Sequence, residues 1–240
     1  MPIPHLTKPD PGRENLETGS PLSPESLLPF QCAGCGSCCR GRRDLLLSGY
    51  DLYRLAVRLD LPPEVVAEGF CDRYTGPDTG FPALRLRPRK DTGGCPFLVN
   101  GRCAVHDARP LACALYPLGQ TIALSEGKAS YFMQDVRCGK RMSGQTLARL
   151  LMGSGIAERE PIDIRWAEVC IEWMDWLASR APSPLQLKFI CRQMEKSLYF
   201  AYDRTAPFLP QFEGNVKALR RKLASLQIPR KDEPDENCDP

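Results

Sequence analysis

Apolar residues recur at intervals of three and four along the C-terminal third of the chain, which is the spacing of one face of an α-helix. The first of these segments is apolar over much of its circumference, so we expect other elements to cover it on more than one side. The pattern predicts a helical region at residues 142–227. The stripes are Ile164, Ala167, Ile171, Met174 and Ala178 with Trp166, Val169, Cys170, Trp173 and Leu177 beside them, then Leu187, Ile190, Cys191, Met194, Leu198 and Ala201, and last Phe212, Val216, Leu219, Leu223 and Leu226.

The preceding region has shorter patterns that predict three short helices. Residues 47–59 have helical spacing after Ser48, whose hydroxyl suits an N-cap, and Asp51 follows three residues later as in a capping box. A second helix is expected over 62–74, because proline is tolerated in a first turn. A third is expected within 107–117, between an aspartate that can cap it and a proline that ends it.

Strands are predicted between these helices. Residues 81–87 alternate between apolar and polar, as in a half-buried strand. In 95–106 the pair Asn100-Gly101 lies between two apolar runs and suits a two-residue type I′ turn, which predicts a β-hairpin. A second hairpin is expected over 120–133.

The chain divides into four segments by composition. Residues 1–28 and 228–240 are rich in proline, charged and small polar residues, and we expect them to be disordered. Residues 29–141 hold the short elements, and 142–227 form the helical region.

Composition and charge exclude several classes of protein. The chain has 32 basic and 29 acidic residues, a balance that does not point to a nucleic-acid partner. No run approaches the roughly 18 apolar residues of a membrane helix, and the start lacks the basic and apolar stretches of a signal peptide. We therefore expect a cytoplasmic protein that binds neither nucleic acid nor membrane.

The cysteines are the strongest indication of function. The chain has 12 of them, and four fall within the octet of residues 32–39. Two intervening residues let a tight turn bring neighbouring thiols to one centre, and glycines in the octet let the backbone fold back. Thiolates favour zinc and iron–sulfur centres. Disulfides are the alternative, but in a reducing compartment such a pattern more often binds metal. The predicted ligands are Cys32, Cys35, Cys38, Cys39, Cys95, Cys103, Cys113 and Cys138.

Neighbouring positions indicate more than one centre. In an extended chain Cys38 and Cys39 would point to opposite sides. In the hairpin, Cys103 would pair with Leu98 and Cys95 with His106, so the two cysteines would lie on opposite faces. Two sites of four thiolates, or one polynuclear cluster, both remain open.

Other candidates have weaker patterns. His106, as cross-strand neighbour of Cys95, could contact or ligate the metal, and Arg109 could donate hydrogen bonds to thiolates near Cys113. A plain hairpin histidine is the favoured interpretation of His106, and a salt bridge beside the short helix is the alternative for Arg109. Core packing is expected of Cys71, Cys170 and Cys191, and no role of the terminal His5 and Cys238.

Together these residues resemble the CxxCxxCC cysteine-cluster family, also called YkgJ-type proteins, which are described as zinc- or iron-chelating domains. The resemblance covers about 30–140, and the helix after Tyr50-Asp51 is similar too. The matching positions are Phe30, Cys32, Cys35-Gly36, Cys38-Cys39, Cys95-Pro-Phe-Leu98, Cys103, Arg109-Pro110, Cys113, Tyr116-Pro117 and Cys138-Gly139.

The resemblance also raises an enzymatic alternative, because flagellin lysine-N-methylase is similar to this family in its cluster. This chain departs from the common pattern at His106-Asp107, where members carry Tyr-Glu, and at Ala114, where an arginine is frequent. It has no glycine-rich strand–turn–helix motif for a nucleotide-like cofactor.

The prediction is an α+β fold, mostly helical, with small hairpins and short helices around a cysteine-ligated metal cluster and a C-terminal helical layer. The function predicted is metal binding by thiolates, with zinc or an iron–sulfur cluster as cofactor. The alternative is a cluster-dependent protein-modifying enzyme.

Overall fold

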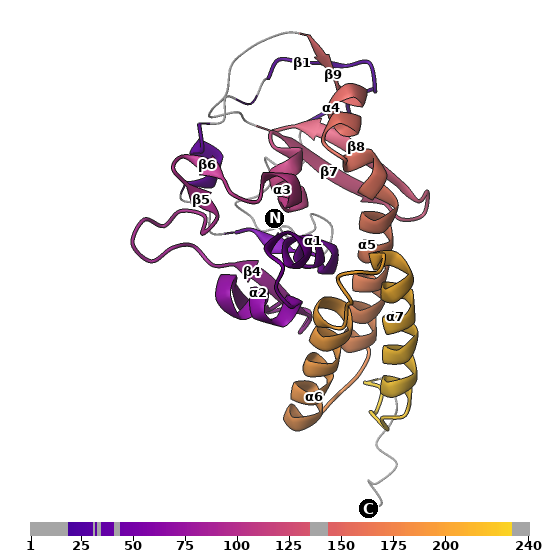
Figure 1. Ribbon diagram of the computed structural model, residues 1–240. Helices are drawn as coiled ribbons and strands as arrows, with labels where there is room; N and C mark the ends of the chain where they lie inside the picture. The colour runs from indigo at the N-terminus through magenta and orange to yellow at the C-terminus, as the bar shows by residue number, and fades with distance from the viewer. Residues whose placement is uncertain (1–18, 31, 33–34, 41–43, 135–143, 232–240) are drawn as a thin grey trace, which may run out of the picture.

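Helices make up 47% of the described residues and strands 17%, and the strands form small antiparallel sheets among the helices, which confirms the predicted α+β class (Figure 1). The structure is a computed structural model and describes residues 19–30, 32, 35–40, 44–134 and 144–231. Within these residues, no helix is long and apolar enough to cross a membrane.

Residues 46–86 form a three-stranded sheet and two helices. The strands are ordered β2 (Leu46–Leu47), β4 (Pro82–Leu86) and β3 (Cys71–Thr75), and the helices are α1 (Gly49–Leu59) and α2 (Pro63–Phe70). The capping box predicted for α1 is confirmed, since Ser48 Oγ accepts from Asp51 N at 3.0 Å and Ser48 N donates to Asp51 Oδ2 at 3.1 Å.

The second predicted helix is wrong over its last residues. α2 ends at Phe70, and Cys71 already has extended backbone with φ −124° and ψ 156°. From there β3 pairs with β4 along its whole length, from Cys71 opposite Leu86 to Thr75 opposite Pro82. Pairing with β4, the next strand along the chain, therefore overrides the helical pattern of the local sequence.

Both predicted hairpins are present. β5 (Leu98–Val99) pairs with β6 (Arg102–Cys103) through a turn in which Asn100 and Gly101 have φ of 50° and 74°, as a type I′ turn requires. β7 (Leu118–Ala123) pairs with β8 (Lys128–Met133). A further pair joins β9 (Gln145–Thr146) to β1 (Leu27–Leu28), and the side chain of Leu28 is buried.

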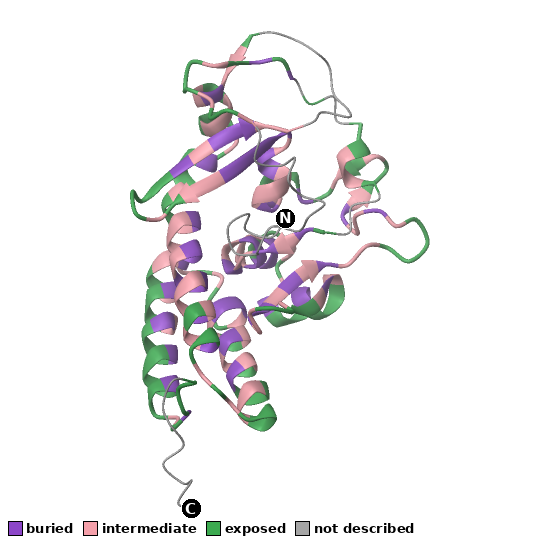
Figure 2. Cartoon of the chain, turned by 180° about the vertical axis from the view of Figure 1, so that it is seen from behind, coloured by how far each residue is buried: buried purple, intermediate pink, exposed green. Residues whose placement is uncertain are grey.

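The C-terminal helices, α5 (Ile156–Ala178), α6 (Pro184–Glu195) and α7 (Phe208–Ala224), lie side by side in both views (Figures 1 and 2). α4 (Leu147–Gly153) precedes them, and the π-helical turn η3 (Lys196–Phe200) extends α6. Buried positions face the interior of this group and exposed positions its outer side (Figure 2). Trp166 packs against Tyr199 and Phe212 at ring centroid distances of 5.3 and 5.7 Å.

One hydrophobic core joins the two halves of the chain. It includes Leu52 and Leu55 of α1 and Phe97 and Val105 beside the β5–β6 hairpin, together with the inner faces of α5, α6 and α7. A smaller cluster lies between β7–β8, α3 (Leu111–Leu115) and α4. The short cysteine-bearing elements are thus attached to the same core that the C-terminal helices build.

Candidate metal centre

Cys38 and Cys39 lie on one side of the chain, which corrects the expectation that they point apart. Gly36 has φ 68°, a left-handed conformation that glycine adopts readily, and it opens the 3₁₀ turn η1 (Ser37–Cys39). In this tight turn the two Sγ atoms are 3.9 Å apart. The expectation failed because it assumed an extended chain, where successive side chains alternate.

Two more predicted ligands reach the same place from other segments. The backbone N–H of Cys95 donates to the carbonyl of Cys39 at 2.8 Å, which fixes this loop against η1. Cys113 lies in the middle of α3. Together with Cys38 and Cys39 they line a cavity of about 40 Å³. The remaining lining residues are Leu45, Leu86, Pro88, Pro96 and Tyr116.

The electrostatics of this cavity disfavour thiolates unless a cation is present. The pKa of Cys39 is raised far above its usual range, first by the hydrogen bond with Cys38, then by burial and by the nearby Cys38, Cys95 and Cys113. Burial is also the largest cause that raises the pKa of Cys95. A bound metal ion reverses this balance, because it favours the deprotonated form of each thiol it contacts.

The donor set suits a thiolate-bound metal. Zn–S bonds of about 2.3 Å in a tetrahedron place sulfur atoms roughly 3.8 Å apart, close to the 3.9 Å between Cys38 and Cys39. Over the described residues, no three histidine, cysteine, aspartate or glutamate side chains are yet close enough together to hold a metal ion. The four thiols line a common cavity, and their sulfur atoms would have to move closer together to bind an ion.

Of the other predicted ligands that the structure describes, none lines this cavity. Cys103 is half-buried in β6, and its proximity contributes to the raised pKa of Cys95. Cys32 and Cys35 are exposed, and Cys35 Sγ donates to Ser37 Oγ at 3.3 Å. Cys138 is outside the described residues, as are His5 and Cys238.

His106 does not pair with Cys95. The register Leu98 to Cys103 is confirmed, but the ladder ends there and His106 begins the 3₁₀ turn η2 (His106–Ala108). Its ring is exposed, and Nε2 accepts a hydrogen bond from Arg109 Nη1 at 2.9 Å. Burial, followed by the charge of Arg109, lowers the pKa of His106. Arg109 and His106 thus bind each other rather than lining the cavity.

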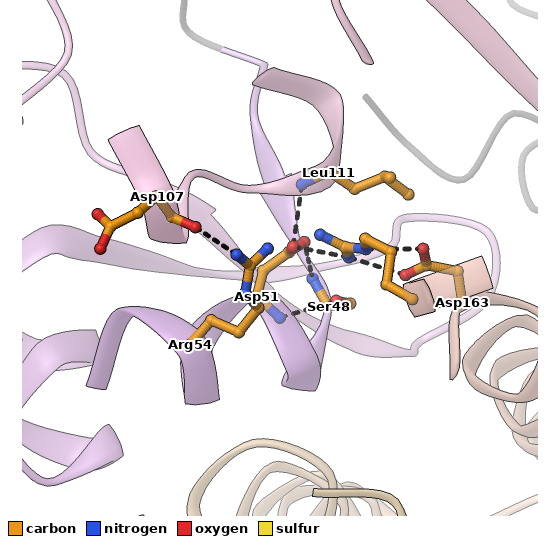
Figure 3. A network of polar contacts seen from close by, with 7 residues as sticks. Ser48, Asp51, Arg54, Asp107, Leu111 and Asp163 are labelled. Atoms are coloured by element: carbon orange, nitrogen blue, oxygen red, sulfur yellow. Dashed lines mark hydrogen bonds and ion pairs between the residues drawn. The ribbon is translucent and has the colours of Figure 1, made fainter. Parts of the chain in front are cut away.

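One polar face of α1 holds the segment that leads to Cys113 (Figure 3). Arg54 donates to the backbone carbonyl of Asp107, and Arg58 Nε to the Asp107 carboxylate at 3.1 Å. Asp51 Oδ1 accepts from the backbone N–H of Leu111, the first residue of α3, at 3.0 Å. These contacts fix the start of α3, two residues before Cys113.

Sequence reasoning missed Arg159 and Asp163 on α5, which complete this network. Arg159 Nη2 donates to Asp51 Oδ1 at 2.9 Å, and its Nε and Nη2 donate to the two carboxylate oxygens of Asp163, both at 2.8 Å (Figure 3). Arg159 and Asp51 are only 2% and 3% exposed. The spacing of four residues between Arg159 and Asp163 was a local signal for an ion pair within the helix, but Asp51, which also binds Arg159, is 108 residues away.

Comparison with known proteins supports the reading of the cysteines. Residues 31–139 match the model of the CxxCxxCC family, whose description is "Putative zinc- or iron-chelating domain". Searches of curated proteins and of solved structures found no match. The matched range includes the four cavity cysteines and the β5–β6 hairpin, and it ends before α4. Residues 31–139 are therefore similar to the zinc- or iron-chelating domain of the CxxCxxCC family, and this similarity supports metal binding.

Proposed function

We propose that this protein binds a zinc or iron centre through the thiolates of Cys38, Cys39, Cys95 and Cys113. One observation carries the proposal: four thiols from three separate segments line one cavity of about 40 Å³. Soft sulfur donors select zinc, cuprous copper or iron–sulfur centres, and the family description names zinc and iron. A bound ion would supply a positive charge that joins η1, the Cys95 loop and α3.

The remaining predicted ligands, Cys32, Cys35, Cys103 and Cys138, would extend this centre. The backbone at Gly36 lies against the β5–β6 turn, where a Cβ on Gly36 would come within 3.0 Å of the Gly101 carbonyl oxygen. Gly36, which opens the turn with Cys38 and Cys39, therefore packs on the hairpin that carries Cys103. This contact supports a second, adjacent set of thiolates, as either a separate site or part of a polynuclear cluster.

A binding or structural role is favoured over catalysis by the lining of the cavity. Apart from the four cysteines it consists of leucine, proline and Tyr116 side chains. Among these lining residues there is no carboxylate, imidazole or ammonium group to act as general acid or base. The relation to flagellin lysine-N-methylase stays a prediction, as does the expected absence of nucleic-acid and membrane partners. A reducing, cytoplasmic location is the compartment in which these thiols would remain available to metal.

Metal analysis of protein purified without oxygen tests the proposal. Zinc, iron and acid-labile sulfide are measured together with the visible absorption spectrum. Colourless protein with stoichiometric zinc would identify a zinc site, and iron with sulfide and visible charge-transfer bands an iron–sulfur centre. Protein without metal would overturn the proposal.

A pair of variants assigns the ligands. Cys113→Ser removes a cavity thiol, and most of the metal should be lost. Cys191→Ser is the matched control, because Cys191 lies on α6, half-buried, with Sγ 3.6 Å from the Gly80 carbonyl oxygen. It should retain the wild-type metal content. Equal loss in both variants would contradict the ligand assignment.

A further inference from the structure

The proposed ligand Cys113 lies on α3, a helix too short to be stable by itself. α3 has five residues, well below the roughly 12 at which an isolated helix becomes even marginally stable. Its N-cap is Pro110, which makes no side-chain capping hydrogen bond. The backbone N–H of Leu111, the first residue of the helix, instead donates to Asp51 Oδ1 of α1 at 3.0 Å. Asp51 therefore caps α3 from 60 residues away in the sequence.

Asp51 can do this as a buried anion only because Arg159 accompanies it. The side chains of Asp51 and Arg159 are 4% and 2% exposed, and a carboxylate so deeply buried needs a paired charge. Arg159 Nη2 reaches the same Oδ1 atom that accepts from Leu111. Asp163 holds the guanidinium in a two-pronged ion pair, and the Tyr50 ring lies 5.2 Å from its central carbon.

We propose that Arg159 is a positioning residue of the metal centre and acts through Asp51 on the orientation of α3 and Cys113. Arg159 lies on α5, outside the matched residues 31–139. The C-terminal helices thus help to set the affinity of the thiolate cavity for metal. The inference rests on the proposed function, since it presumes that Cys113 is a ligand.

Cobalt(II) titration of the full chain tests this role, and a control variant of similar kind accounts for any general loss of stability. The intensity of cobalt–thiolate charge-transfer absorption reports how many sulfurs are bound, and competition with a chromophoric chelator gives the affinity. Arg159→Met should weaken cobalt and zinc binding by about 10–100-fold, the usual effect of losing a partner that orients a ligand. Its charge-transfer absorption should fall toward that of Cys113→Ser.

Arg180→Met is the matched control. Arg180 follows α5, donates to the Ile228 carbonyl at 3.3 Å and stacks on Trp176, away from α3. Arg180→Met makes the same substitution in the same region, so it should leave the metal affinity and the cobalt spectrum unchanged whatever its effect on stability. Arg159→Lys keeps the charge but loses the two-pronged geometry, so its metal affinity should lie between those of the wild type and Arg159→Met. This variant also tests the inference where Arg159→Met does not fold.

A double-mutant comparison separates action through Asp51 from a general effect. In Asp51→Asn the carboxylate charge is gone, so a further Arg159→Met change should weaken metal binding by less than it does in the wild type. Equal affinity and spectra for wild type, Arg159→Met and Arg159→Lys would overturn the inference and leave the proposed function intact. Failure of the wild-type protein to bind metal would overturn both.

Discussion

The two regions of this molecule hold their shape by different means. The C-terminal helices bury large side chains completely, among them Tyr199, Phe212 and Met194. In the cysteine region, residues 31–139, the cavity thiols are carried by η1 and α3, which have three and five residues, and by the irregular loop between β4 and β5. Elements this short bury too little surface to be stable alone. Apolar packing suffices for the first region, whereas the second needs added attachments.

Those attachments are of two kinds. α1 supplies polar contacts, through Asp51, Arg54 and Arg58, to the segment that ends at α3. The proposed metal supplies the other, because it would bind several short segments to one ion. The contrast implies that loss of metal and loss of core packing should have effects in different places.

Removing the metal should have the largest effect, confined to the cysteine region. Thiolate-bound structural zinc contributes on the order of 10 kcal/mol to the domain that holds it. After treatment with a strong chelator we expect amide hydrogens of residues 35–40, 95–103 and 111–115 to exchange much faster, with α5, α6 and α7 still protected. Hydrogen exchange measured by mass spectrometry checks this. Uniform acceleration along the chain would show that the two regions do not differ as described.

Removing a core side chain should lower the stability of the C-terminal helices and leave the metal centre unchanged. Phe212 is fully buried against Trp166 and Phe208, with ring centroids 5.7 and 5.4 Å apart. Phe212→Ala should lower the free energy of unfolding by about 3–5 kcal/mol, without changing metal content per folded chain. Denaturant unfolding with metal analysis measures both quantities.

An exposed residue provides the control for this change. Leu185 on α6 is 79% exposed, so Leu185→Ala should change the free energy of unfolding by less than about 0.5 kcal/mol. A metal loss in Phe212→Ala that exceeds its unfolded fraction would contradict the separation.

Local signals in the sequence accounted for much of this fold. The capping box of α1 is set by two residues three apart, and the type I′ turn by Asn100-Gly101, so both could be identified from neighbours alone. The stripes of the C-terminal helices follow from helical period. β3 could not be predicted, because its extended conformation depends on pairing with β4, from Thr75 opposite Pro82 to Cys71 opposite Leu86, and not on its own residues.

The candidate site was predictable in composition but not in arrangement. The cysteines were evident, and the grouping of Cys38 with Cys39 was not, since it depends on a 3₁₀ turn that begins at Gly36 in a left-handed conformation. Arg159 was missed for a physical reason: its partner Asp51 is 108 residues away, and no periodic pattern joins them. Contacts between distant segments are what the sequence pattern lacks.

The link between the two regions has its own pH dependence. Burial, opposed by Arg159, raises the pKa of Asp163 to about 6, and Asp51 and Arg54 are the other charged groups that act on it. A raised carboxyl pKa means that the folded protein binds the proton more tightly, so stability falls as pH rises from about 4 to about 6. The loss should be on the order of 1–3 kcal/mol.

Asp163→Asn checks this sign. The amide does not titrate, so the fall in the free energy of unfolding between pH 4 and pH 6 should be smaller than in the wild type. Denaturant unfolding across this pH range measures it for both proteins. A steeper fall in the variant would mean that the ion pair with Arg159 outweighs burial.

The smallest effect is expected from two glycines, and it differs in sign between them. Gly101 has φ 74° in the β5–β6 turn, and a Cβ there would meet no atom within 4 Å. Gly101→Ala should therefore destabilise by about 1–2 kcal/mol through left-handed strain alone. Gly69, in helix α2, also has open space around a Cβ, so Gly69→Ala should stabilise the protein by about 0.5–1 kcal/mol.

The two variants should also differ in the rate at which they release metal to a chelator. Because Gly101 adjoins Cys103 and η1, only Gly101→Ala should speed this release. Equal release rates from the two variants would place the hairpin turn outside the influence of the metal centre.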